Sequence, residues 1–401
     1  MHKQTIQDID LKGKRVLIRV DFNVPQNEQG KITDDARIVK SLETIRYALG
    51  QNAKVILMSH LGRPKGKPET QYSLRPAAER LSELLGKKVG LAPDCIGPAV
   101  EERVKAMKNG EILLLENLRF HAEEEKNDPQ FSKKLASLAE VYVNDAFGTA
   151  HRAHASTVGV TQYLPSVAGF LLSKEIEYFE KATTHPDRPF VTILGGAKVS
   201  DKIKLIAHLM EKADAFLIGG AMAYTFCNVQ GMRTGNSKLD KDGEGAAREA
   251  LAKSKIKNVP LILPTDHVIA QKLEKGAATK VVTKDIPDGW MGLDIGPETV
   301  RKFKETLAGA KTVLWNGPVG VFEIPPFDQG TREIAKFLAG LRATTIIGGG
   351  DTAAAVTALG LENKMSHVST GGGASLEYLE GAVLPGVATL RDKKTAAAGS
   401  K

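Results

Sequence analysis

Polar and cationic side chains follow short apolar segments at four places in the first half of the chain. The candidates for binding a ligand there are Asp21, Phe22, Asn23, Arg37, His60, Leu61, Gly62, Arg63, Arg119 and Arg152. Guanidinium groups form paired hydrogen bonds with phosphate and carboxylate groups, and Asp21 and Asn23 offer polar groups that recognise a hydroxyl. Any one arginine could instead be a surface residue paired with a nearby glutamate. As a set at equivalent positions, these residues indicate a site for a small phosphorylated acid.

Glycine-rich loops follow the apolar segments of the second half. They lie at residues 195–198, 219–221, 316–320, 348–352 and 369–373. Glycine lets the backbone approach a ligand closely, and free amides at the start of a helix bind phosphate oxygens. One such loop could be a tight turn, but five in one half of the chain favour a nucleotide site. Its candidate residues include Gly195, Gly196, Ala197, Gly219, Gly349, Gly350 and Thr352.

Two lysines and one aspartate in these loops could act on a phosphoryl group. Lys198 and Lys202 are four residues apart, so they would share one face if the segment were helical. One could contact the transferring phosphoryl group and the other the nucleotide phosphates. Asp351 is the candidate for holding Mg²⁺, which binds proteins through few carboxylates together with nucleotide oxygens. A helix N-cap is the alternative role for Asp351, and both roles are compatible.

Histidine and cysteine give weaker indications of a metal site. His151 and His154 lie near Asp145, but two histidines do not make a structural metal site, so a phosphate-facing or structural role is favoured. Cys95 and Cys227 are far apart in the chain and show no CxxC or histidine pattern. We therefore expect two buried, inert thiols, no disulfide framework and no zinc site.

The elements that position these loops alternate between apolar strands and amphipathic helices. Strands are predicted at Arg15–Val20, Lys54–Met58, Lys88–Leu91, Glu111–Leu115, Val141–Val143, Phe190–Leu194, Ala215–Ile218, Pro260–Leu263, Lys280–Val282, Thr312–Trp315 and Thr344–Ile347. Helices are predicted at Ala77–Leu85, Pro129–Ala139, Ser200–Lys212, Gly296–Leu307 and Thr331–Ala339. Near-continuous apolar runs are typical of parallel strands covered on both faces, and about a dozen strands exceed one comfortable open sheet. The pattern predicts an α/β fold of two doubly wound domains, each with a mostly parallel six-stranded sheet flanked by helices. Ligands bind at the carboxyl ends of such strands, where the candidate loops lie.

A helical hinge should join the two domains. Ser166–Ala182 is predicted as one helix, followed by the turn-rich sequence TTHPDRP. An ordinary crossover helix within one domain is the alternative. We expect residues 1–165 together with 386–401 to form the first domain, 166–185 the hinge, and 186–385 the second domain. Frayed structure is expected at the C-terminal TAAAGSK.

Composition and charge restrict the function classes. The chain has 401 residues, a formal net charge of +8 and only 5% aromatic residues. The positive charge suits an anionic partner, but dispersed lysine and arginine with few aromatic residues disfavour nucleic acid. No apolar run approaches a membrane span and the N-terminus has no apolar signal core, so we expect a cytoplasmic protein. Neither GxxxxGK[ST] nor GxGxxG occurs, which argues against P-loop kinases, protein kinases and nicotinamide-dependent dehydrogenases.

The ordered motifs of the chain resemble those of the phosphoglycerate kinase family. The resemblance runs from residue 8 to about residue 390 and includes RVDFNVP, DDARI, MSHLGRP, ENLRF, VNDAFGTAHRAHAS, LGGAKVSDKI, WNGPVGVFE, GGGDT and STGGGASLE. It implies that the first-half set binds the triose substrate. It implies a nucleotide site at Lys198, Lys202, Gly292, Asn316, Glu323, Gly349, Gly350, Asp351 and Thr352. Glu323 would hold the ribose hydroxyls and Asp351 the metal, while Gly371 and Gly372 would lie near the transferring group.

The resemblance also implies a reaction. A member of this family transfers the 1-phosphoryl group of 1,3-bisphosphoglycerate reversibly to MgADP, giving 3-phosphoglycerate and MgATP in glycolysis, gluconeogenesis or carbon fixation. Direct in-line transfer implies ligands on facing domains, domain closure and no covalent phosphoenzyme. We expect Arg37, Lys198, Gly371 and Gly372 to be catalytic, with Lys198 and Arg37 balancing charge on the phosphoryl oxygens. The expected protein is a monomer whose partners are these metabolites, ATP or ADP and Mg²⁺, without nucleic acid or membrane.

Overall fold

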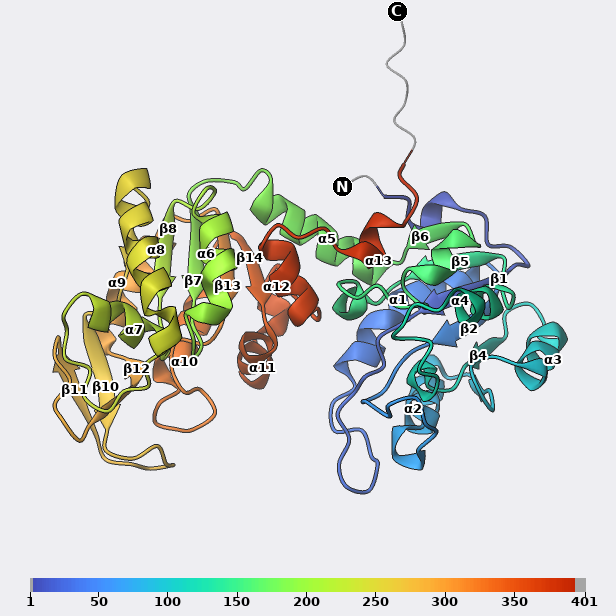
Figure 1. Cartoon of the computed structure of the whole chain (residues 1–401), viewed down its shortest axis with the longest axis horizontal. Coiled ribbons are helices and arrows are strands. Elements are labelled where there is room, and N and C mark those ends of the chain that lie inside the picture. Colours follow the sequence, from blue (N-terminus) through green and yellow to red (C-terminus); the bar gives the residue numbers. More distant parts are fainter. Residues whose placement is uncertain (1–2, 394–401) are drawn as a thin grey trace, which may run out of the picture. The chain divides into compact units, whose positions relative to one another are not determined.

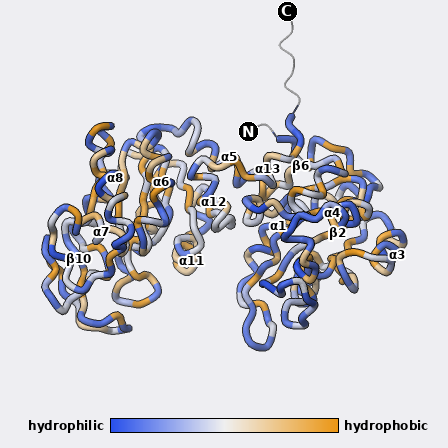
Figure 2. The backbone as a smooth tube through the Cα atoms, viewed as in Figure 1, coloured by the Kyte–Doolittle hydropathy of each residue, from blue (hydrophilic) through white to orange (hydrophobic). Residues whose placement is uncertain are grey.

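The computed structural model describes residues 3–393, which form two compact units (Figure 1). The first unit comprises the chain up to Glu177 and from Val383 onward, and the second is Tyr178–Ala382. The predicted frayed tail lies outside the described residues. Within each unit, hydrophobic segments alternate along the chain with hydrophilic loops (Figure 2). This alternation is what buried strands and helices joined by surface loops require.

Six parallel strands form the sheet of the first unit, in the order β3-β4-β2-β1-β5-β6. They are β1 (Arg15–Arg19), β2 (Lys54–Met58), β3 (Gly90–Leu91), β4 (Ile112–Leu114), β5 (Val141–Asn144) and β6 (Ser166–Ala168). The helices are α1 (Ala36–Gly50), α2 (Arg75–Leu85), α3 (Pro98–Ala106), α4 (Pro129–Ala136), α5 (Phe170–Thr183), which continues into the second unit, and α13 (Pro385–Ala388). Short 3-10 helices lie at η1 (Ile6–Asp8), η2 (Thr70–Tyr72), η3 (Leu118–Phe120), η4 (Phe147–Thr149) and η5 (Gly159–Gln162). Val16, Ile18, Val55 and Leu57 from the two central strands are fully buried in one hydrophobic core.

A second sheet of six parallel strands forms the centre of the second unit, in the order β15-β14-β13-β7-β8-β9. The strands are β7 (Phe190–Leu194), β8 (Ala215–Ile218), β9 (Leu261–Ile262), β13 (Thr312–Asn316), β14 (Thr344–Gly348) and β15 (His367–Val368). The helices are α6 (Ile203–Leu209), α7 (Met222–Val229), α8 (Glu244–Lys257), α9 (Pro297–Ala308), α10 (Gln329–Ala339), α11 (Gly350–Ala358) and α12 (Gly373–Leu379), with 3-10 helices η6 (Ser200–Lys202), η7 (Lys241–Gly243) and η8 (Glu362–Lys364). Ile193, Leu217, Val313 and Trp315 are buried in its core. The two sheets confirm the predicted fold class.

A three-stranded antiparallel sheet accompanies the second large sheet and was not predicted. Its order is β11-β10-β12, with β10 at Asp266–Ala270, β11 at Thr279–Thr283 and β12 at Met291–Ile295. The predicted strand Lys280–Val282 therefore belongs to this small sheet rather than to the parallel one. β11 is an edge strand of the small sheet, and four of its five residues are exposed. Such a strand does not need the two covered faces that a central strand of a parallel sheet requires.

The segment predicted as one helix from Ser166 is a strand followed by a helix. Ser166–Ala168 pairs in parallel with Tyr142–Asn144, and α5 begins only at Phe170. Gly169 lies between the two elements. Only glycine fits at this position, because a Cβ there would lie 2.1 Å from Asp145 Oδ1. The amides of Leu171 and Leu172 donate to that same oxygen at 2.9 and 3.3 Å, which caps the start of α5. A neighbouring strand thus decided the structure of this segment.

Throughout the described part of the chain, helices are too short or too polar to span a bilayer.

Candidate active site

The loops after β1 and β2 of the first unit are joined by polar contacts. Arg37, in the first turn of α1, forms an ion pair with Asp21 at 3.1 Å and donates to the carbonyl oxygen of Asn23 at 3.0 Å. The side-chain oxygen of Asn23 accepts a hydrogen bond from the Gly62 amide at 2.9 Å. Arg119, from η3 after β4, donates to the Gly62 carbonyl oxygen at 2.9 Å. Three post-strand loops predicted to meet at one sheet edge therefore do meet there.

Phe22, Leu61 and Gly62 shape these loops. The side chains of Phe22 and Leu61 are buried in the core, and the Phe22 amide donates to Ser59 Oγ at 2.8 Å. Gly62 has φ of 61°, and a Cβ there would lie 2.4 Å from the ring of Tyr72. These positions hold the backbone in place, so any ligand contact they make would be through backbone groups.

The arginines at this edge differ in how far they are neutralised. Arg63 and Arg152 are exposed, and neither forms an ion pair within residues 3–393. Arg119 is half-buried and lies 3.3 Å from Glu125. Burial lowers the pKa of Arg119, and the nearby charge of Arg63 adds to this effect while Glu125 opposes it. Several positive charges thus gather where few carboxylates compensate them, which favours binding of an anion.

A buried polar network underlies this surface. Arg19, at the end of β1, is 1% exposed, and its Nε donates to Ser156 Oγ at 2.9 Å. The carboxylate of Glu124, which is fully buried, accepts two hydrogen bonds from Ser156. One comes from the Ser156 amide at 3.0 Å and the other from its hydroxyl. A terminal nitrogen of Arg19 lies 3.2 Å from His60 Nδ1. Since a guanidinium group only donates, His60 Nδ1 must accept and its hydrogen must be on Nε2.

Burial and positive neighbours keep two histidines of this edge neutral. Burial lowers the pKa of His60 well below its usual range, and the charges of Arg19, Arg119 and Arg37 lower it further. Burial lowers the pKa of His154 to about 4, with Arg119, Arg19 and Arg152 adding to the effect. Both imidazoles are therefore neutral at pH 7, and His60 acts as a hydrogen-bond partner of Arg19 rather than as a charge.

In the second unit, the glycine loops pack against one another. A Cβ on Gly195 would lie 2.0 Å from the carbonyl oxygen of Pro318, and one on Gly219 would lie 2.6 Å from Val319 Cβ. Several of the amides are already used, because Gly195 donates to Asn316 at 3.1 Å and Gly196 to Pro318 at 3.1 Å. The amides of Gly195, Gly196 and Gly219 bond within the protein and are therefore not free to bind phosphate. Close packing of neighbouring strand ends uses the same freedom of glycine that ligand binding would use.

Lys198 and Lys202 do not share a helical face. Lys198 lies before η6, and Lys202 is the last residue of that 3-10 helix. The helix predicted to start at Ser200 therefore begins with this 3-10 turn, and the α-helix starts only at Ile203. Lys198 and the neighbouring Ala197 are exposed, whereas Lys202 donates to the side-chain oxygen of Asn316, a buried residue at the end of β13. The pKa of Lys202 is lowered overall by burial, although the negative charges of Asp201 and Asp351 oppose this shift. Lys202 is thus held in the loop and Lys198 is free to reach a ligand.

The segment 349–352 starts α11, and its residues have separate roles. Gly349 is the N-cap residue with φ of 85°, so the alternative N-cap role considered for Asp351 is excluded. Asp351 is exposed in the first turn, and Gly350 leaves open space where a side chain would be. Thr352 is buried, and its hydroxyl accepts from the Gly317 amide at 2.7 Å. The amides of the first turn of a helix have no partner within it, which makes this loop the one best suited to phosphate.

The remaining nucleotide-site candidates lie around these loops. Gly292, in β12, is buried, and a Cβ there would lie 2.1 Å from the hydroxyl of Tyr224. Glu323 is exposed and forms no ion pair within the described range. Gly371 and Gly372 lie between β15 and α12, where Gly372 is the N-cap with φ of 50°.

Arg19 and Glu124, the buried charges beneath the basic edge, were not predicted from the sequence. A charged residue inside the apolar run RVLIRV was the available signal, because such a residue must find partners when the strand is buried. His151 and His154 are not part of the grouping of metal-binding side chains found in residues 3–393. Among the described residues, the side chains placed to hold a metal are instead Asp94, Cys95 and His121.

Comparison with known proteins decides the family of this chain. A family model described as "Phosphoglycerate kinase" matches residues 6–382. The chain belongs to the phosphoglycerate kinase family. The phosphoglycerate kinase of Fervidobacterium nodosum is 57% identical over 399 residues, which covers 98% of this chain and 100% of that protein. A protein from Volvox carteri named "Phosphoglycerate kinase, chloroplastic" is 57% identical over 400 residues, 98% of this chain and 87% of its own.

Solved structures of phosphoglycerate kinases share the fold. The enzyme from Coxiella burnetii aligns with a TM-score of 0.89 at 42% identity, covering 96% of this chain and 98% of that one. The enzyme from Pyrococcus horikoshii aligns with a TM-score of 0.84 at 34% identity, covering 97% and 98%. The protein is accordingly a kinase of glycolytic type that transfers a phosphoryl group reversibly between 1,3-bisphosphoglycerate and ADP. Phosphoglycerate kinases use the magnesium complexes of ATP and ADP.

Proposed function

We propose that the basic edge of the first unit binds the phosphoglycerate. Arg63, Arg119 and Arg152 would hold its phosphate, since two of these guanidinium groups are exposed without a carboxylate partner in the described range. His60, with its hydrogen on Nε2, would donate to the substrate. Asp21 and Asn23 would recognise a hydroxyl, and their contacts to Arg37 and Gly62 hold them in position. The unneutralised charge at this edge is the observation that carries the assignment.

The strand ends of the second unit would bind the nucleotide. The start of α11 would receive phosphate oxygens at its first-turn amides. Gly195, Gly196, Ala197, Gly219 and Gly292 would line the site through their backbone, and Glu323 would hold the ribose hydroxyls. Lys202 and Asn316 support the phosphate loop by their mutual hydrogen bond.

The residues present suit Mg²⁺ carried with the nucleotide. Asp351 is an exposed carboxylate beside the phosphate-binding start of α11, and no ion pair occupies it in residues 3–393. Mg²⁺ prefers one or two carboxylates together with phosphate oxygens. When bound, the ion would neutralise charge on the nucleotide phosphates.

The transfer itself is proposed to be direct. Lys198 and Arg37 would balance the charge on the phosphoryl oxygens, together with backbone groups of Gly371 and Gly372. Attacking and leaving oxygens must stand on opposite sides of the phosphoryl group, so the proposal includes closure of the two units, which would also exclude water. We place the hinge in residues 166–185, with residues 1–165 and 386–401 as the phosphoglycerate domain and 186–385 as the nucleotide domain. The remaining parts of the proposal are a monomeric state, a cytoplasmic location and no nucleic-acid partner.

Binding measurements on matched variants test the assignment of the two sites. Arg152→Ala should weaken 3-phosphoglycerate binding in calorimetry by about tenfold or more and leave ADP binding unchanged, because one charged hydrogen-bond partner is lost. Glu323→Gln should weaken ADP binding and leave 3-phosphoglycerate binding unchanged. Weaker ADP binding in Arg152→Ala with normal phosphoglycerate binding would contradict the proposal. A coupled assay for ATP formation from 1,3-bisphosphoglycerate and ADP confirms that each variant is an active enzyme.

A further inference from the structure

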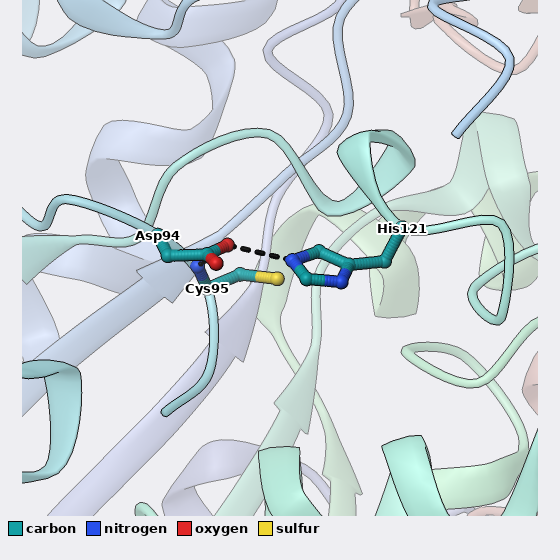
Figure 3. Close-up of side chains that lie close together, drawn as sticks. All are labelled: Asp94, Cys95 and His121. Atoms are coloured by element: carbon teal, nitrogen blue, oxygen red, sulfur yellow. Dashed lines mark hydrogen bonds and ion pairs between the residues drawn. The ribbon is translucent and has the colours of Figure 1, made fainter. Parts of the chain in front are cut away.

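Three side chains with metal-binding atoms meet in the first unit. Asp94 and Cys95 follow β3, and His121 follows η3 (Figure 3). Their carboxylate, thiol and imidazole groups each offer one atom, and these atoms all lie within 4.8 Å of one another. Figure 3 shows the three side chains converging on the same space. Asp94 Oδ1 and His121 Nε2 lie 2.7 Å apart.

We propose that Asp94, Cys95 and His121 form a binding site for a zinc-like divalent cation, with water as the fourth ligand. Thiolate and imidazole are the ligands that Zn²⁺ and similar borderline metals select, and a carboxylate completes a common three-residue set. Mg²⁺ prefers oxygen ligands, so this site would not compete for the ion that accompanies the nucleotide.

A tetrahedral centre would require the ligand atoms, now within 4.8 Å of one another, to adjust their spacing. With metal–nitrogen and metal–oxygen bonds of about 2.0–2.1 Å and a metal–sulfur bond of about 2.3 Å, the ligand atoms stand roughly 3.3–3.6 Å apart. Asp94 Oδ1 and His121 Nε2 would therefore separate slightly from their present 2.7 Å. The cation would take the place of the hydrogen that now bridges them.

Two of the three groups are exposed to solvent. Cys95 is fully buried, whereas the side chains of Asp94 and His121 are 42% and 26% exposed. A metal would thus approach from solvent, with the sulfur below it and its water ligand outward. Asp94 also accepts from the Cys95 amide at 2.6 Å, which holds the first two ligands together.

The thiol is inert until a metal arrives. Burial raises the pKa of the Cys95 thiol well above its usual range, and the charges of Asp94 and Glu124 raise it further. Binding would release the thiol proton to solvent as the sulfur becomes a thiolate, and the imidazole of His121 would carry its hydrogen on Nδ1 so that Nε2 can bind the metal. The same nearby carboxylates that oppose a free thiolate would favour a cation beside it.

Titration with Co²⁺ in the absence of nucleotide tests the site on the full chain. We expect one equivalent of Co²⁺ to produce tetrahedral visible absorption and a near-ultraviolet band from thiolate-to-cobalt charge transfer. Zn²⁺ should abolish both bands, and Mg²⁺ should leave them unchanged. Absence of the charge-transfer band in the wild-type protein would overturn the proposal.

Variants assign the band to these residues. Cys95→Ser and His121→Ala should lose the charge-transfer band or weaken Co²⁺ binding at least about 100-fold, since even outer partners of metal ligands change affinity by about 10–100-fold. Cys227→Ser is the matched control, because it removes the other thiol, which lies in the second unit, and should leave the spectrum unchanged. A band that survives Cys95→Ser, or disappears in Cys227→Ser, would refute the assignment. The wild-type protein alone provides a further measurement, since Zn²⁺ should raise its melting temperature and Mg²⁺ should not.

Discussion

The proposed binding regions of the two units are built by different means. In the first unit, side chains form the site, and a buried network of Arg19, Ser156 and Glu124 supports them. In the second unit, backbone forms most of the site, and glycines such as Gly195 allow strand ends to pack at distances that exclude a Cβ. The first depends on charge balance and the second on steric fit. Substitutions in the first unit should therefore disturb binding or stability through lost charge balance, and substitutions in the second unit through steric clashes.

Lys198 is the exception in the backbone-built region, and its loss should have the largest effect. Lys198→Ala removes an exposed cation that bonds to nothing else in residues 3–393, so turnover should fall about 10³-fold or more while stability stays unchanged. Steady-state kinetics and a thermal melt measure the two quantities. Lys204→Ala removes a neighbouring exposed lysine and should keep normal turnover. Near-normal turnover in Lys198→Ala would end the catalytic role assigned to this residue.

Removal of Arg19 should destabilise the side-chain-built region. Arg19→Met leaves the buried Glu124 carboxylate without its nearby cation, at a cost of about 3–5 kcal/mol in the free energy of unfolding. Both tryptophans, Trp290 and Trp315, lie in the second unit, so hydrogen exchange of β1 and β5 is the appropriate measurement.

The same residue should determine the tautomer of His60. Nitrogen-15 NMR of the wild-type protein should show His60 neutral with its hydrogen on Nε2, because Nδ1 accepts from Arg19. A hydrogen on Nδ1 in the wild-type spectrum would contradict this arrangement, whether or not the variant folds.

A methyl group in the backbone-built region should act through sterics. Gly195→Ala places a Cβ 2.0 Å from the Pro318 carbonyl oxygen and should destabilise the second unit by about 3 kcal/mol. Urea unfolding followed by Trp315 fluorescence reports on this unit. Gly245→Ala in α8 is the control, since nothing lies within 4 Å of its Cβ, and it should be neutral or stabilising by up to about 1 kcal/mol. Equal stability of the two variants would refute the steric explanation.

The smallest expected effect is a pH dependence confined to the side-chain-built region. His154 has a pKa of about 4 in the folded protein, lowered by burial and by Arg119, Arg19 and Arg152, with Glu124 3.9 Å away as the opposing charge. The unfolded chain binds the proton at higher pH, so stability should be lost as pH falls from about 6.5 to 4. This loss should reach about 2–3 kcal/mol in the wild-type protein relative to His154→Gln. Hydrogen exchange of β5 at several pH values measures it, and a constant difference between the two proteins would contradict it.

Local pattern predicted much of this protein. The strands at Lys54–Met58 and Phe190–Leu194 have the predicted bounds, because a run of buried apolar residues between polar loops is specified locally. The convergence of Asp21, Asn23, Arg37 and Arg119 followed from the rule that parallel strands present their carboxyl ends at one edge. A partner distant in sequence decided one error, because Ser166–Ala168 became a strand that pairs with β5. The alternative N-cap role of Asp351 was excluded locally, because Gly349 takes that position.

By itself, the sequence determined the family, the two-sheet fold class and the residue types available at each strand end, since motif order and apolar periodicity are properties of the chain alone. Only the tertiary structure decided how the available groups are used. It showed that the amides of Gly195 and Gly196 bond within the protein, that Arg19 and Glu124 meet beneath the basic edge through Ser156, and that Asp94 and Cys95 face His121. Each of these depends on atoms far apart in sequence, and burial fixes their interaction only once the chain has folded.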